Sequence, residues 1–121
     1  MTLAGRTFTS LDDIYAALPP LKCRRLCGAY CGPLLTSREE AQRVSGRLPL
    51  GTRPDPYTCR FRTDAGECGI YDLRPLICRI WGTTKTLQCS EGCEPERWLD
   101  EPEARWLIME SLRIGGGMVR F

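Results

Sequence analysis

The 121-residue chain contains no histidine. This absence excludes hydrolases that use an imidazole base, the histidine-containing deaminase arrangement, and zinc sites that mix cysteine with histidine. Any metal site in this chain should therefore be rich in cysteine thiolates. Such sulfur-rich coordination favours zinc or an iron–sulfur cluster over magnesium, calcium or manganese.

Long apolar runs are also missing. No stretch approaches the roughly 18 apolar residues that cross a bilayer, and the first residues contain no apolar segment like that of a signal peptide. We therefore expect a cytoplasmic protein with no membrane partner. The net charge is only +2 and no basic stripe is interleaved with aromatic residues, so nucleic-acid binding is not expected as the main role.

Cysteine is abundant. In a reducing cytoplasm, eight cysteines favour metal binding or redox chemistry over four disulfides. One or two of them can instead be small buried core residues, but that interpretation does not suit all eight. The eight are Cys23, Cys27, Cys31, Cys59, Cys68, Cys78, Cys89 and Cys93.

The cysteine spacing helps to choose between the two metals. Structural zinc sites commonly place two residues between paired cysteines, and this chain has no such pair. Three residues separate Cys23 from Cys27, Cys27 from Cys31, and Cys89 from Cys93. Because a cluster is wider than one ion, these spacings favour iron–sulfur, although zinc sites with three or four intervening residues also occur.

Capping signals predict two short helices in the first half of the chain. Ser10 precedes an amphipathic segment with acids in its first turn, which predicts a helix over 11–18. Ser37 and Glu40 form a capping box for a helix over 38–45. That signature favours a capping role for Glu40 over acid–base catalysis.

The second half contains further predicted elements. The longest helix is expected over about 101–114, where a run of glycines ends it. A short helix should start at Pro75, and residues 83–88 have the β-branched content of a strand. Segments 58–62 and 67–71 should form an antiparallel hairpin. That pairing would bring two of the cysteines close together.

Arginines near the cysteines are candidates for charge compensation. Four thiolates around Zn²⁺, or around an oxidised [4Fe–4S] core, leave a net charge of about −2. We expect Arg24, Arg74 and Arg79 to contact the centre, with Arg25 and Arg60 as further candidates. Each can equally be a surface arginine of an arginine-rich protein.

Several motifs resemble those of a known family. They are Cys23-x3-Cys27-x3-Cys31, a Leu-Leu-Thr-Ser-x-Glu-Glu helix start, Cys59, and Cys68-Gly-Ile-Tyr-x-x-Arg-Pro-x-x-Cys78-Arg. Over roughly 23–93 the chain resembles the YkgJ-like cysteine-cluster proteins, described as a zinc- or iron-chelating domain. The resemblance implies a small metal-binding domain of no agreed activity, with some members attached to protein methylases. The chain departs from the family at Tyr30, where a second, adjacent cysteine is usual.

These features together predict one small α+β domain over 1–121, with its core at 23–93. Short helices and a small antiparallel hairpin would surround a cysteine-ligated metal centre. We expect an oxygen-sensitive [4Fe–4S]-type iron–sulfur centre in a redox, sensing or structural role, with an unidentified protein or redox partner. The alternative is a zinc-stapled structural or protein-interaction module without redox activity. Whether the protein is an enzyme stays open.

The expected ligand set divides the thiols into two groups. Three ligands would be Cys23, Cys27 and Cys31, which we call the first cysteine group, and the fourth would be Cys59, Cys68 or Cys78. The remaining thiols could form a second site with Cys89 and Cys93. The sequence does not fix this partition.

Overall fold

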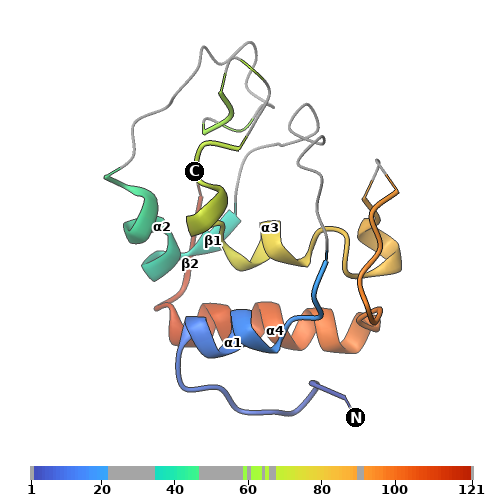
Figure 1. Ribbon diagram of the computed structural model, residues 1–121. Helices are drawn as coiled ribbons and strands as arrows, with labels where there is room; N and C mark the ends of the chain where they lie inside the picture. Colours follow the sequence, from blue (N-terminus) through green and yellow to red (C-terminus); the bar gives the residue numbers. More distant parts are fainter. Residues whose placement is uncertain are drawn as a thin grey trace.

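The computed structural model describes residues 2–21, 35–46, 59, 61–63, 65, 68–89 and 92–120. This part of the chain contains α-helices, short 3-10 helices and a two-stranded antiparallel sheet, which confirms the predicted α+β class (Figure 1). No helix within these ranges is both long and apolar enough to cross a membrane. The elements are α1 (Leu11–Ala17), β1 (Leu35–Ser37), α2 (Arg38–Val44), η2 (Tyr71–Leu73), α3 (Leu76–Ile80), η3 (Lys85–Leu87), α4 (Glu101–Ile114) and β2 (Met118–Arg120).

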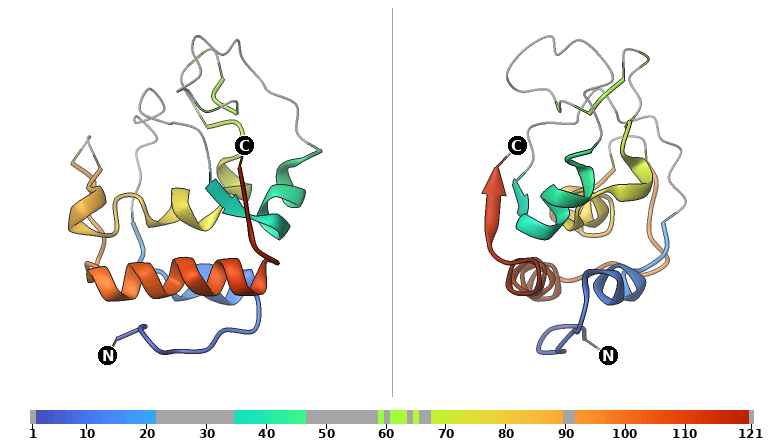
Figure 2. Two further views of the ribbon diagram at one scale, coloured as in Figure 1. Left: turned by 180° about the vertical axis from the view of Figure 1, so that it is seen from behind. Right: turned by 90° about the vertical axis from the view of Figure 1, so that its left-hand side faces the viewer.

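The elements form two layers. Helices α1 and α4 lie side by side in one layer, and α2, α3 and the sheet lie in the other (Figures 1 and 2). Between the layers is an apolar cluster, the helical core, in which each of the five most buried side chains is at most 1% exposed. These five are Leu11, Ile14, Leu76, Ile80 and Leu107. Burying such a side chain contributes about 1.5–3 kcal/mol, so this core accounts for the pairing of α1, α3 and α4.

The predicted helix starts are confirmed. The Ser10 hydroxyl accepts a hydrogen bond from the backbone N–H of Asp13. Ser37 and Glu40 form the expected capping box of α2, and Asp100 and Glu103 form a second one at the start of α4. Each cap satisfies backbone donors that the helix itself leaves without partners.

The sheet was not predicted. Strand β2 follows the glycines at the end of α4 and pairs antiparallel with β1, Ser37 lying opposite Met118. The same region joins the end of α4 to the start of α2, because the Gly115 carbonyl accepts a hydrogen bond from the Glu39 N–H at 2.9 Å. A Cβ on Gly115 would lie 2.3 Å from the Ser37 Cβ, so this close approach requires glycine.

The predicted hairpin is present only as one isolated antiparallel bridge within the described residues, between Arg62 and Cys68. The Gly69 N–H donates to the Phe61 carbonyl at 2.8 Å beside that bridge. Several residues of the two predicted strands lie outside the described ranges.

The predicted strand over 83–88 is wrong. Residues Lys85–Leu87 form the 3-10 helix η3, and Thr84 makes a single parallel bridge to Leu99. Gly82 has a φ of +88°, and its N–H donates to the Leu87 carbonyl at 2.6 Å. That closed turn overrides the β propensity of the threonines.

Two buried carboxylates of α4 hold the N-terminal segment in place. Glu103, 2% exposed, accepts the Leu3 N–H at 2.9 Å and both terminal nitrogens of Arg97 at 3.0 Å. Glu110, 5% exposed, accepts the Phe8 N–H at 3.1 Å. Residues before α1 are therefore fastened to the longest helix by charge-assisted hydrogen bonds.

The Glu103 contacts predict acid sensitivity. The Arg97 guanidinium, helped by backbone N–H donors, lowers the pKa of Glu103 from 4.5 to about 2. A lowered folded-state pKa contributes stability above about pH 4.5, and that stability is lost as the pH falls toward about 2. We expect Glu103→Gln to lower the unfolding free energy at neutral pH by about 1.5–3 kcal/mol and to flatten the loss in acid.

Urea denaturation at about pH 3 and about pH 6 measures both effects. Glu101→Gln, on the same turn but exposed, is the matched control and should behave like the wild type. A Glu103→Gln protein with wild-type stability at both values would contradict the interpretation.

Candidate metal centre

Three cysteines meet at a second apolar cluster, which we call the cysteine core. Its buried members, each at most 7% exposed, are Val44, Cys59, Phe61 and Ile70. Cys68 and Cys78 pack against it and are partly buried. Three chain segments therefore each contribute one cysteine to the same cluster.

Helix α3 positions Cys78. The helix begins after Pro75, and the Cys78 N–H donates to the Pro75 carbonyl at 3.0 Å. Leu76 and Ile80 point into the helical core, while Ile77 and Cys78 pack against the cysteine core. One short helix thus links the two cores.

Glu40 is the hydrogen-bonding centre of this region. Its side chain is 2% exposed and accepts the Thr36 hydroxyl at 3.1 Å and the Ser37 hydroxyl at 2.8 Å. It also accepts hydrogen bonds from the Tyr15 hydroxyl and, at 2.6 Å, from the Leu76 N–H. The capping role was predicted, but the contacts to α1 and α3 were not. Burial, together with the hydrogen bond to Glu40, raises the pKa of Tyr15.

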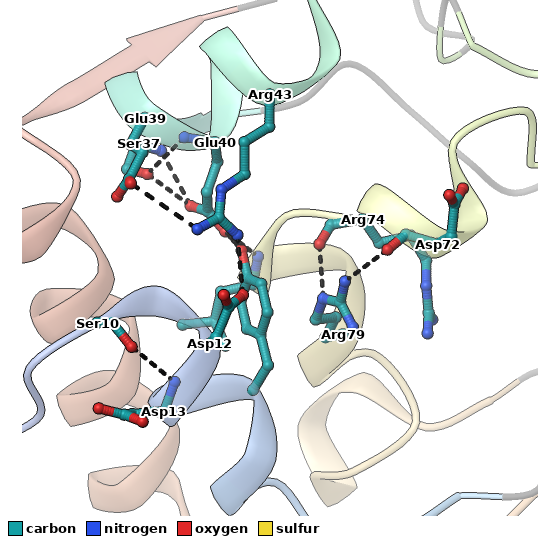
Figure 3. Close-up of polar contacts among 12 residues, drawn as sticks. Ser10, Asp12, Asp13, Ser37, Glu39, Glu40, Arg43, Asp72, Arg74 and Arg79 are labelled. Carbon is teal, nitrogen blue, oxygen red and sulfur yellow. Dashed lines mark hydrogen bonds and ion pairs between the residues drawn. The ribbon is translucent and has the colours of Figure 1, made fainter.

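The two described arginines that were expected to contact a cofactor make other contacts. Arg79 donates from Nε to the Arg74 carbonyl at 2.6 Å and from a terminal nitrogen to the Asp72 carbonyl at 3.2 Å (Figure 3). Its guanidinium lies 4.0 Å from the centre of the Tyr15 ring. Arg74 donates to the Tyr71 carbonyl at 2.9 Å and stacks on the Tyr71 ring. These contacts brace the turn that precedes α3.

Arg62 differs from both. Its Nε atom is buried, and no hydrogen-bond partner for it is found among the described residues. An unsatisfied buried donor costs about 1–3 kcal/mol, and more when the group is charged. Arg62 lies opposite Cys68 in the isolated bridge. Arg62 was not predicted to be a site residue, although the predicted hairpin places it beside the second strand.

A backbone hydrogen bond lies between the last two cysteines. The Gly92 N–H donates to the Cys89 carbonyl at 3.2 Å, and Gly92 has a φ of +80°. Just after Cys93, Pro95 forms an antiparallel bridge with Leu21. The segment that follows Cys93 is therefore paired with the residue two positions before Cys23.

The remaining predicted site residues lie outside the described ranges. They are Cys23, Cys27, Cys31, Arg24, Arg25 and Arg60. Within the ranges that are described, no group of three or more cysteine or acidic side chains has an arrangement that could hold a metal ion. Cys59, Cys68 and Cys78 therefore do not complete a metal site by themselves.

Fold and cysteine core together define a small α+β domain with cysteines gathered at one apolar cluster. Comparison with protein-family models, with curated proteins and with solved structures gave no match.

Proposed function

We propose that this protein binds an iron–sulfur centre of the [4Fe–4S] type through cysteine thiolates. The observation that carries the proposal is the meeting of Cys59, Cys68 and Cys78 at the cysteine core. These cysteines come from three separate segments and pack on the same apolar side chains, where further thiols can join them. The resemblance to the YkgJ-like family, which we propose as the family of this chain, supports the same chemistry.

The donor set fits such a centre. The sequence offers thiols and no histidine, and the apolar lining of the cysteine core suits a cluster whose potential depends on limited solvent access. The Nε donor of Arg62 beside Cys68 suits an anionic sulfur site. When bound, the centre would supply one-electron transfer, sensing of oxidants, or structural support.

The proposed ligands follow from this arrangement. One of the three cysteines at the cysteine core would join the three of the first cysteine group. The two cysteines of the cysteine core that remain would form a second site with Cys89 and Cys93. The proposed ligands of the first centre are Cys23, Cys27 and Cys31 with one of Cys59, Cys68 and Cys78.

Zinc is the second candidate. A structural zinc ion takes four protein ligands, which can all be cysteines, and the eight cysteines of this chain supply enough of them. In that case the metal would staple the domain for a structural or protein-interaction role without redox activity.

Visible spectroscopy of protein purified without oxygen tests the proposal. We expect a brown protein whose visible absorption decreases on reduction with dithionite and is lost in air. A colourless protein that contains zinc would support the second candidate. A colourless protein that contains neither metal would overturn both.

A further inference from the structure

We propose that Arg62 is a binding residue of the metal centre, with its Nε–H donating a hydrogen bond to a sulfur atom at Cys68. The Cys68 sulfur does not accept this hydrogen bond in the present structure, so the acceptor belongs to the loaded centre: the metal-bound thiolate, or a sulfide of the cluster that this thiolate binds. This inference rests on the proposed function and adds to it the residue that compensates the charge of the centre.

The bridge geometry places the two side chains together. Arg62 and Cys68 face each other in an antiparallel bridge, and the Gly69 N–H donates to the Phe61 carbonyl. That hydrogen bond joins Phe61, which precedes Arg62, to Gly69, which follows Cys68. Arg62 and Cys68 are therefore a non-hydrogen-bonded pair of the antiparallel bridge. In such a pair the side chains lie on the same face and closer together than in the alternative pair.

Burial explains why the donor needs a partner. Buried polar groups in folded proteins nearly always have a hydrogen-bond partner, and a guanidinium is a cation as well as a donor. The Nε atom of Arg62 is buried, and no partner for it is found among the described residues. An anionic sulfur site supplies both an acceptor and a compensating charge.

The neighbouring arginines do not have this property. The Nε of Arg74 donates to the Tyr71 carbonyl, and the Nε of Arg79 donates to the Arg74 carbonyl. Both groups are therefore satisfied by the protein backbone. Of the three guanidinium groups in this region of the described chain, Arg62 is the one with a buried donor to offer.

Two variants test the assignment in protein purified without oxygen. Arg62→Met removes the charge and the donor but keeps a long apolar side chain. Arg62→Lys keeps the charge and removes the planar Nε donor. Arg105→Met is the matched control, because Arg105 is exposed on α4 and the change in net charge is the same.

We expect Arg62→Met to lose its metal to a chelator at least about 10-fold faster than the wild type, the usual effect of removing a residue that supports a metal ligand. A cluster in this variant should also have a lower reduction potential, since a cation and a hydrogen bond favour the more negative reduced state. Arg62→Lys should fall between the wild type and Arg62→Met. Arg105→Met should match the wild type.

The outcomes separate this inference from the proposed function. If the wild type holds metal and Arg62→Met matches it in chelation rate, visible spectrum and potential, the Arg62 assignment is overturned and the metal centre stands. If the wild type holds no metal, both are overturned. If Arg62→Met does not fold, Arg62→Lys decides, and wild-type behaviour of that variant overturns the Nε contact.

Discussion

Replacing Glu40 with alanine should lower the free energy of unfolding by about 4 kcal/mol or more. The Glu40 carboxylate is 2% exposed and accepts hydrogen bonds from the Tyr15 hydroxyl, two hydroxyls of β1 and the Leu76 N–H. Alanine would leave several buried donors without an acceptor at once. Because a domain of this size has a total stability of about 5–15 kcal/mol, the variant should be only marginally folded.

Two further variants make this test specific. Glu39→Ala changes the neighbouring residue on α2, whose side chain is 45% exposed, and should shift stability by no more than about 0.5 kcal/mol. Glu40→Gln keeps the shape and one acceptor, so its effect should be smaller than that of alanine. Thermal and urea denaturation followed by circular dichroism measure all three. A Glu40→Ala protein as stable as Glu39→Ala would contradict the role assigned to this carboxylate.

The second large effect is expected from removing the metal. Chelation, or replacement of Cys78 by serine, should abolish the helical circular dichroism signal in one cooperative step. Metal binding contributes roughly 10 kcal/mol to the folding of small metal-dependent domains, which is comparable with the entire stability of this one. Helix α3 carries Cys78 on one side and packs Leu76 and Ile80 into the helical core on the other, so loss of the cysteine core should spread to α1 and α4.

Cys78→Ala separates a ligand from a core residue. If Cys78 only packs against its neighbours, alanine should cost about 1 kcal/mol and serine more, because serine adds a buried hydroxyl. If Cys78 is a ligand, both variants should lose metal and helical signal alike. Ala104→Ser, which places a hydroxyl in the helical core, controls for the polar change. A metal-free protein that keeps the native circular dichroism spectrum would contradict a role for the metal in folding.

Local signals in the sequence were enough to predict the α-helices, though not the 3-10 helices η2 and η3. Ser10, Ser37 and Asp100 are caps whose effect depends on the next three or four residues, and α1, α2 and α4 begin where these caps place them. Pro75 likewise precedes α3. Such signals do not depend on the rest of the fold.

Features that depend on distant residues could not be predicted. Strand β2 pairs with a segment more than 80 residues earlier, and no local pattern specifies that partner. The threonines near Thr84 favour a strand by composition. The hydrogen bond from the Gly82 N–H to the Leu87 carbonyl closes a turn instead, and the residues within it form η3. Glu40 was identified as a cap, whereas its contacts to Tyr15 and Leu76 exist only because α1 and α3 pack beside α2.

The candidate site follows the same division. Cysteine content and spacing predict a thiolate site, and the structure brings Cys59, Cys68 and Cys78 to one apolar cluster. The role of each arginine could not be assigned from its position near a cysteine, because Arg74 and Arg79 bond to backbone carbonyls while Arg62 keeps a buried donor beside Cys68.

The central claim is that the cysteines hold an iron–sulfur centre, and the iron and acid-labile sulfide content per chain tests it most directly. Protein purified without oxygen should contain iron and sulfide in equal amounts, about four of each per chain for one [4Fe–4S] centre. Stoichiometric zinc without iron or sulfide, or no metal at all, would contradict the claim.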